Sequence, residues 1–252
     1  MTEHPQSSYY NRQMASTHTL VTIATYNELA NLPLLVDEVF RHAPDADILV
    51  IDDNSPDGTG RWADDKSGSE PRLHVLHRPG KLGLGTATMA GMKYAIEHGY
   101  DFVLNLDGDF SHHPRYIPAL LAGMDQADVM IGSRYVLGGG APDWPWSRRL
   151  ASRGVNLLAR GLLGLTPRDC SGAFRCYRVS LLEQLDFNQV RSRGYAFQEE
   201  ILWRLKRLGA RLGETPIVFA DRRQGQSKVT AAEAFNTLAV ILRLGLTNWC
   251  KF

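Results

Sequence analysis

The sequence predicts an α/β protein in which a mostly parallel sheet is covered by helices on both faces. Two observations predict this fold. Short β-rich runs that are apolar throughout alternate with segments that carry apolar residues at helical spacing. Strands without polar alternation are typical of parallel sheets that are buried on both sides. The chain of 252 residues has room for one large domain of this kind.

The first half of the chain is expected to hold most of the sheet. Pro44 and Gly99 mark the ends of two helices, and the turn-rich segment Asn54–Gly60 follows the second strand. The predicted strands are Thr19–Thr25, Asp47–Ile51, Leu73–His77, Phe102–Leu106 and Val129–Gly132. The predicted helices are Leu29–His42, Gly85–His98 and Tyr116–Ala127.

The second half is less regular and begins with the Gly/Pro/Trp-rich loop Gly138–Trp146. The elements predicted there are the helices Arg148–Leu163 and Gln198–Leu208, the strand Glu214–Phe219 and the long, mostly apolar helix Ala231–Trp249. We therefore divide the chain into a polar, disordered tail (1–17), an α/β domain (18–230) and a C-terminal helix (231–252).

Composition argues against several classes of protein. A formal net charge of +1 gives no global basic field, so nucleic acid is not an expected partner. The three cysteines are too few and too scattered for a disulfide framework or a zinc site, which favours a reducing cytosol. The N-terminus lacks the apolar core of a signal peptide, and no uncharged run reaches the roughly 18 apolar residues of a spanning helix.

Two acidic groups lie directly at the ends of predicted strands. Asp52-Asp53 ends the second strand, and Asp107-Gly108-Asp109 follows the fourth. Ligands of parallel sheets bind beyond the carboxyl ends of the strands, so both groups are expected to line one crevice. Asp53 can hydrogen-bond a ribose or a base edge, and ordinary turn chemistry is the alternative interpretation of its segment.

Asp107 and Asp109 are the candidate metal ligands. Two carboxylates one residue apart can hold one Mg²⁺ or Mn²⁺, because these ions prefer oxygen ligands. Such an ion can bridge the phosphates of a nucleotide sugar. A solvated acidic turn is the alternative. His112 and His113 follow, but adjacent residues do not readily face one ligand, so a structural role is expected for at least one of them.

Basic residues form the candidate phosphate clamp. Arg134 follows the fifth predicted strand, and Arg148 begins the next helix. Arg222 and Lys228 lie in the polar segment DRRQGQSK. Guanidinium groups match phosphate oxygens in two-point contacts, which suits a crevice that receives several negative charges.

A set of short motifs now identifies a resemblance. In chain order they are Thr25-Tyr26-Asn27-Glu28, DDNSPDGT from Asp52, LGLG from Leu82, DGDFSHHP from Asp107, GSRY from Gly132, SRRLASRGVN from Ser147, SGAFRCYR from Ser171, GYAFQEE from Gly194 and DRRQGQSK from Asp221. With these motifs the sequence resembles the polyprenyl-phosphate (dolichyl-phosphate) mannose synthases, which are family 2 glycosyltransferases of the Rossmann-like GT-A fold. It departs from that family's usual pattern at Ala24 (Pro) and Gly108 (Ala).

The resemblance implies a role for each matching residue. Nucleotide contacts fall to Ala24, Tyr26, Glu28, Ile51 and Asp53. The metal and diphosphate site falls to Asp107, Gly108 and Asp109. Phosphates would be held by Arg134, Arg222 and Lys228, with Arg148 as a further acceptor-phosphate residue, and Gln198 and Glu199 would lie near the sugar. The candidate catalytic residues are Asp109, Arg134, Arg148 and Arg222.

The implied reaction transfers mannose from GDP-mannose to a polyprenyl phosphate in a membrane, with inversion at the anomeric carbon. One alternative is the same transfer with another sugar, such as glucose or N-acetylglucosamine. An alternative of another class is a non-catalytic nucleotide-sugar-binding regulatory subunit. The presence of both the acidic and the basic set argues against that alternative, since a pure binder needs no acceptor-phosphate clamp.

The C-terminal helix is the expected contact with the membrane surface. Its apolar residues recur near helical spacing, with Asn236 and Arg243 as interruptions. A helix lying in the interface fits this pattern, and so does a helix packed on the domain or against a second copy. The expected location is peripheral, at the cytoplasmic face of a membrane, and a homo-oligomer remains open.

Overall fold

The computed structural model describes residues 17–220 and 231–249, and within the last helix the side chains of residues 235–248. Arg222 and Lys228, two of the expected phosphate-binding residues, lie outside the described residues. The strands are β1 (Thr19–Thr25), β2 (Asp47–Asp52), β3 (Leu73–His77), β4 (Phe102–Asp107), β5 (Val129–Ser133), β6 (Arg175–Arg178) and β7 (Leu212–Pro216). The α-helices are α1 (Leu32–His42), α2 (Thr59–Ser67), α3 (Leu84–Glu97), α4 (Ile117–Gly123), α5 (Trp146–Leu163), α6 (Val179–Leu182), α7 (Phe197–Arg207) and α8 (Ala231–Trp249).

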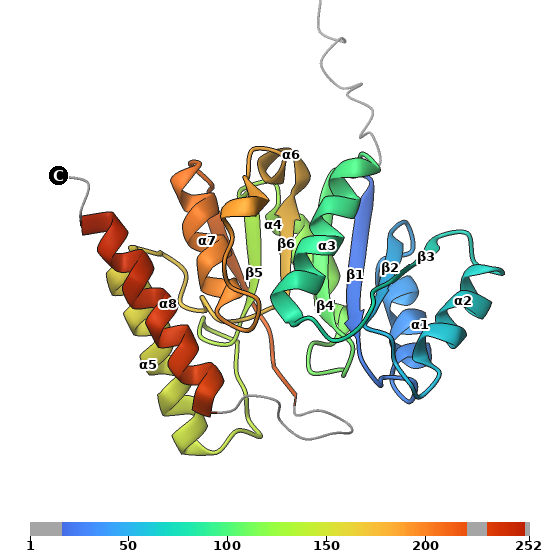
Figure 1. Ribbon diagram of the computed structural model, residues 1–252, viewed down its shortest axis with the longest axis horizontal. Coiled ribbons are helices and arrows are strands. Elements are labelled where there is room, and N and C mark those ends of the chain that lie inside the picture. The colour runs from blue at the N-terminus through green and yellow to red at the C-terminus, as the bar shows by residue number, and fades with distance from the viewer. Residues whose placement is uncertain (1–16, 221–230, 250–252) are drawn as a thin grey trace, which may run out of the picture.

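The strands form one sheet in the order β3-β2-β1-β4-β6-β5-β7. Only β6 runs against its neighbours β4 and β5, so the expected α/β fold with a mostly parallel sheet is confirmed. Helices α1, α2 and α4 contribute to the core on one face, whereas α3, α7 and the α5–α8 pair contribute to the core on the other (Figure 1). Because all strands but β6 run in the same direction, their carboxyl ends lie at one edge of the sheet.

The strand β6 and the helix α2 are absent from the prediction, as is the short helix α6. The strand β6 contains two arginines in four residues, so it lacks the apolar run that marks the other strands. The helix α2 has the sequence TGRWADDKS, which carries no apolar stripe and buries only small side chains. In β6 and α2 the local sequence pattern is weak, and packing against the rest of the domain determines the structure.

Several predicted boundaries are wrong. The first helix begins at Leu32 rather than Leu29, with Pro33 in its first turn, where the missing N–H of proline costs no helical hydrogen bond. The segment predicted as Tyr116–Ala127 divides into a 3₁₀ turn, Pro114–Tyr116, and α4. The strand predicted at Glu214–Phe219 is β7, which ends at Pro216, and Val218 adds only an isolated bridge to Gly140.

Glycines let α3 approach the rest of the domain closely. A Cβ atom at Gly85 would lie 2.6 Å from Cβ of Phe197 on α7. A Cβ atom at Gly91 would lie 2.8 Å from a methyl group of Thr22 on β1. Both separations are shorter than van der Waals contact, so α3 can occupy this position only with glycine at both sites.

The last helix packs on the domain through one face. Val240, Ile241 and Leu244 are buried, and the side chain of Asn248 bridges two elements. It accepts a hydrogen bond from Trp203 Nε1 at 2.9 Å and donates one to the carbonyl oxygen of Leu162 at 3.2 Å. Figure 1 shows α8 lying along α5 at one end of the molecule. Among the described helices, none is long and apolar enough to cross a bilayer.

Candidate active site

Strand register brings three of the predicted residues side by side at the carboxyl edge of the sheet. In the parallel ladders Ala24 of β1 lies opposite Ile51 of β2 on one side and opposite Asp107 of β4 on the other. Residues directly opposite one another in adjacent strands share one face of the sheet. Two of the expected nucleotide contacts and one expected metal ligand therefore meet at one place.

Asp52 and Asp53 have separate partners despite being adjacent. Asp52 accepts hydrogen bonds from Thr25 Oγ1 at 3.1 Å and from the Ser55 hydroxyl at 2.6 Å, so it holds the turn together. Asp53 is paired with Arg78, whose Nε lies 2.6 Å from Asp53 Oδ1, and both side chains are nearly buried. Arg78 also donates to Thr86 Oγ1 at 2.9 Å. This ion pair holds the carboxylate of Asp53 in one orientation. Asp53 is therefore a candidate for contact with the nucleoside.

The loop after β1 carries Tyr26 and Glu28. The backbone N–H of Glu28 donates to Thr59 Oγ1 at 3.0 Å, and Glu28 Oε2 accepts from the side chain of Asn31 at 3.0 Å. The amino group of Lys81 lies 5.0 Å from the centroid of the Tyr26 ring. The loop is thus tied to the turn after β2, and Tyr26 is close to the glycine-rich segment that precedes α3.

The acidic motif at the end of β4 has one partly exposed and one buried carboxylate. The side chain of Asp107 is 29% exposed. Asp109 is buried, and its Oδ1 accepts from the backbone N–H and the hydroxyl of Ser111 at 3.0 and 2.5 Å. Phe110 has a φ of 62°, so the chain turns sharply after Asp109. Two carboxylates at this edge fit the oxygen chemistry of a divalent cation.

His112 supports this motif. Its Nδ1 lies 3.3 Å from Asp107 Oδ2, and its ring packs against the rings of Phe174 and Phe219 at centroid distances of 5.2 and 5.1 Å. The structural role expected for one of the paired histidines therefore belongs to His112. His113 faces elsewhere: one ligand atom each from Glu38, His42 and His113 lies within 4.8 Å of the others, a group that the sequence did not suggest.

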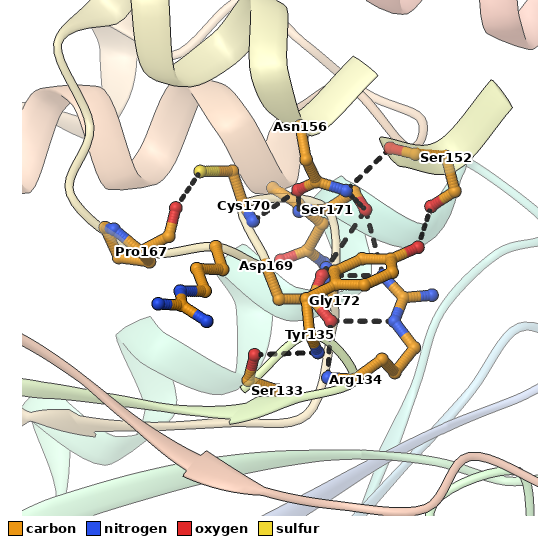
Figure 2. A network of polar contacts seen from close by, with 12 residues as sticks. Ser133, Arg134, Tyr135, Ser152, Asn156, Pro167, Asp169, Cys170, Ser171 and Gly172 are labelled. Atoms are coloured by element: carbon orange, nitrogen blue, oxygen red, sulfur yellow. Dashed lines mark hydrogen bonds and ion pairs between the residues drawn. The ribbon is translucent and has the colours of Figure 1, made fainter. Parts of the chain in front are cut away.

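Arg134 is the centre of a buried polar network (Figure 2). Its Nε and Nη2 donate to the two oxygens of Asp169 at 2.7 and 2.6 Å, and Nη2 also donates to Ser171 Oγ at 2.9 Å. Burial opposes both charges, but the attraction within the pair outweighs it, so the pKa of Asp169 is lowered and that of Arg134 is raised. Arg134 is therefore permanently charged and fixed in orientation.

Arg148 and Arg134 both lie against the ring of Trp144. The guanidinium carbon of Arg148 is 4.0 Å from the centroid of the Trp144 ring, and that of Arg134 is 5.0 Å from the same centroid. Guanidinium groups bind phosphate oxygens well, so two of them at one aromatic ring suit an anionic ligand. The structure thus joins two of the predicted phosphate-binding residues.

Gln198 and Glu199 begin α7 and are buried. Arg175 of β6 donates from Nη1 to the carbonyl oxygen of Gln198 at 2.8 Å and from Nη2 to that of Cys170 at 2.7 Å. Burial raises the pKa of the Glu199 carboxyl to about 7, against the lowering effect of a backbone hydrogen bond and of Arg175. Glu199 is therefore poised to change charge near neutral pH.

Four supporting residues are missing from the sequence-based set: Arg78, Trp144, Asp169 and Arg175. Arg78 directly follows the strand Leu73–His77, so its place at a carboxyl end was a usable signal. Asp169 lies in a loop without a periodic pattern, and its role depends on a partner 35 residues away. No local pattern could have identified it.

Comparison with known proteins now places the chain in a family. Residues 20–186 match glycosyl transferase family 2. The chain belongs to this family. An undecaprenyl-phosphate mannosyltransferase of Micrococcus luteus is 42% identical over 227 residues, which is 90% of this chain and 93% of that protein. A polyprenol monophosphomannose synthase of Mycolicibacterium smegmatis is 42% identical over 230 residues, covering 90% of this chain and 87% of that protein.

The fold of this glycosyltransferase is also found in solved structures. A glucosyl-3-phosphoglycerate synthase of Mycobacterium tuberculosis, solved with Mn²⁺, UDP and glucosyl-3-phosphoglycerate, superposes with a TM-score of 0.68. That alignment covers 91% of this chain and 80% of the other at 18% identity. The expected GT-A fold is thereby confirmed.

Proposed function

We propose that this glycosyltransferase moves a mannosyl group from GDP-mannose to a polyprenyl phosphate, with inversion at the anomeric carbon. The observation that carries the proposal is that Arg134 and Arg148 both lie against the ring of Trp144. This ring packs on Phe219, which in turn packs on His112 beside the acidic motif. A second cationic site fits an acceptor that carries a phosphate. The named activities of the two 42% identical relatives support the same acceptor and sugar.

The nucleotide of the donor binds over the ends of β1 and β2 in this proposal. Its contacts are Ala24, Tyr26, Glu28, Ile51 and Asp53. Support comes from the strand register, which puts Ala24 and Ile51 opposite each other, and from Arg78, which fixes the carboxylate of Asp53. A carboxylate in a fixed orientation can accept two hydrogen bonds from a ribose or a base edge.

The diphosphate lies at the end of β4, beside Asp107, Gly108 and Asp109. Asp107 and Asp109 would hold Mg²⁺ or Mn²⁺, which neutralises the charge that develops on the departing diphosphate. Gly108 passes close to β1, since a Cβ atom there would lie 3.3 Å from the carbonyl oxygen of Ala24. His112 lies next to Asp107, with its Nδ1 3.3 Å from Asp107 Oδ2.

The acceptor phosphate is held by Arg134 and Arg148, joined by Arg222 and Lys228. One of its oxygens attacks the anomeric carbon, the bond from that carbon to the diphosphate oxygen breaks, and GDP leaves with the electron pair. A phosphate monoester is already anionic near pH 7, so this step needs no general base. The arginines contribute by positioning the nucleophile and by reducing the repulsion between the two phosphate groups.

The sugar lies near Gln198 and Glu199 at the start of α7. Arg175 supports this placement, because its guanidinium ties the Gln198 backbone to the loop that carries Asp169. The buried start of α7 and the Arg134 network are thus connected through Arg175.

The membrane is reached through the α5–α8 pair. Exposed apolar side chains are spaced four and seven apart on each helix, so each set lies on one side of its helix. They are Trp146, Leu150 and Leu157 on α5, and Phe235, Leu242 and Leu246 on α8. Helices of this kind can lie in the interface with their apolar side in the lipid. In the proposal α8 combines both predicted placements: its buried face packs on the domain, and its exposed apolar side lies in the membrane interface.

A donor panel tests the proposal. Purified protein is incubated with a polyprenyl phosphate in detergent and with GDP-mannose, GDP-glucose, UDP-glucose or UDP-N-acetylglucosamine, with Mg²⁺, with Mn²⁺ or with excess chelator. The expected result is a mannosylated lipid from GDP-mannose that requires the divalent ion. A product from another sugar nucleotide alone would overturn the choice of donor, and binding without any product would favour the regulatory-subunit alternative.

A further inference from the structure

Buried polar atoms without partners gather beneath the carboxyl edge of the sheet. Within the described side chains, seven buried nitrogen or oxygen atoms lack a hydrogen-bond partner. Four of the seven are Asn105 Nδ2, Arg175 Nε, Gln198 Oε1 and Glu199 Oε2. Asn105 of β4 lies opposite Arg175 of β6 in the ladder, and Arg175 in turn contacts Gln198. Native interiors leave few such atoms unpaired, so their concentration here indicates a missing partner.

Asn105 is the member of this group nearest the acidic motif. It is 7% exposed, and it stands two residues before Asp107, so both side chains lie on the same face of β4. Thr22 Oγ1 donates to Asn105 Oδ1 at 2.9 Å, which leaves the amide nitrogen without a partner. Turning the amide over would only exchange the two atoms and leave the oxygen unpaired instead. A group that both donates and accepts satisfies this position in either orientation.

A small cavity provides space for such a group. It is lined by residues of β1, β2, α3 and β4 and by the loop before β6, among them Ala24, Ile51, Thr88, Asn105 and Asp107. Its size suits a single water molecule or a single hydroxyl group. The hydroxyl of Thr88 donates to the carbonyl oxygen of Leu84 at 3.1 Å, so its oxygen can accept from an occupant. Three of the lining residues belong to the proposed donor site, so the cavity lies at its floor.

We propose that Asn105 binds one hydroxyl group of the nucleotide sugar and determines which donors the enzyme accepts. The inference rests on the proposed function and adds to it a residue that sets donor specificity. A buried amide that pairs with a substrate hydroxyl discriminates against an analogue that lacks this hydroxyl, because the amide is then left unpaired. The hydroxyl belongs either to the ribose or to the hexose, since both flank the diphosphate that Asp107 adjoins.

The test is a thermodynamic cycle that combines a change of the Asn105 side chain with the removal of single hydroxyl groups from the donor. Wild type and Asn105→Leu are compared by kcat/KM with GDP-mannose, with its 2-, 3-, 4- and 6-deoxy hexose analogues, and with the ribose 2′-deoxy and 3′-deoxy analogues. Leucine has the branched shape and the number of side-chain heavy atoms of asparagine but has no polar atom. A second variant, Asn105→Ser, carries a small hydroxyl group instead of the amide and leaves room for a water molecule, and it serves if the leucine variant is unstable.

One analogue is expected to behave differently from the others. Wild type should lose about 10- to 100-fold in kcat/KM with it, and Asn105→Leu should use it within about threefold of GDP-mannose. The remaining analogues should keep their wild-type ratios in the variant. Thr88→Val, which alters the same cavity, should keep a measurable part of the discrimination, because the amide remains.

Equal ratios for every analogue in wild type and in a folded Asn105 variant would overturn the inference, since Asn105 would then bind only water. An equal loss on all donors would also overturn it, because the residue would then act through the position of Asp107. Failure of wild type to transfer mannose from GDP-mannose would instead contradict the proposed function, so the two failures are distinguishable.

Discussion

At the carboxyl edge of the sheet, three charged side chains of the candidate site are each held in place by a partner residue. Arg78 fixes Asp53, Ser111 fixes Asp109, and Asp169 fixes Arg134. Such second contacts remove the entropy cost of ordering the side chain when the ligand arrives. The residues that touch the ligand in the proposed reaction are therefore ordered before it binds.

Asp109→Asn tests the metal site at this scale. The amide oxygen can still accept from Ser111, so the fold should keep its thermal stability, but one ligand charge is lost. We expect transfer to fall by at least about 10²-fold. The rate of lipid mannosylation is measured against Asp125→Asn, an exposed aspartate beyond α4, which should be unaffected. Full activity of Asp109→Asn, or of wild type in excess chelator, would show that transfer does not require a metal ion at Asp109.

Glu199 gives a prediction for the pH dependence of stability. Its folded-state pKa of about 7 is above the usual 4.5, so the folded state favours the protonated form. The stability contributed by this group is fully present below about pH 4.5 and is lost as the pH rises from there to about 7, because over this range the unfolded state ionises while the folded state stays protonated. Glu199→Gln removes the ionisation and should therefore gain stability relative to wild type between about pH 4.5 and 7 and keep that gain above pH 7.

The measurement is the melting temperature of both proteins across this pH range. Glu183→Gln, at the exposed end of α6, is the matched control and should show no trend. A constant difference between Glu199→Gln and wild type from pH 4.5 to 7 would show that the pKa of Glu199 is not raised.

At the scale of elements, α5 is joined to the loop that positions Arg134. Asn156 of α5 accepts from the backbone N–H groups of Cys170 and Ser171 at 2.6 and 3.2 Å (Figure 2). Its amide nitrogen donates to Ser171 Oγ at 3.1 Å. The side chain of Asn156 thus orders the loop that carries Asp169, the ion-pair partner of Arg134.

Asn156→Leu should destabilise the protein by about 2–4 kcal/mol, because it leaves two buried backbone donors without an acceptor. Leu157→Ala, one residue further and exposed on the same helix, should change stability by less than about 0.5 kcal/mol. Urea denaturation gives both free energies. Similar values for the two variants would show that the network contributes nothing to stability.

Much of this level of structure could be predicted from the sequence. The parallel strands carry strong apolar runs, and the acidic motifs follow them directly, so β1 to β5 and the place of Asp53 and Asp107 were within reach. By contrast, β6 has no such run, and the partners of Arg134 are contributed by a distant loop and by α5. Contacts that arise only from tertiary packing leave no periodic trace in the sequence.

At the scale of the whole molecule, the α5–α8 pair gives the domain an apolar end. Leu242→Glu combined with Leu246→Glu should abolish binding to phosphatidylcholine vesicles, since each leucine transferred to lipid contributes roughly tenfold in affinity. Gln126→Glu combined with Gln184→Glu adds the same charge at exposed sites elsewhere and should leave binding unchanged.

Vesicle sedimentation and mass in solution are measured for both double variants. Unchanged sedimentation of the leucine variant would contradict a membrane contact at this face. A wild-type dimer that dissociates in the leucine variant would assign the face to a second copy of the chain instead.

The central claim is direct displacement by the acceptor phosphate within this crevice. The anomeric configuration of the lipid-linked product tests it most directly, measured by one-bond carbon–hydrogen coupling in the NMR spectrum of the product made from GDP-α-mannose. A single displacement predicts a β-linked mannosyl phosphate. An α-linked product would contradict the account, because it requires a double displacement and a nucleophile that the account does not contain.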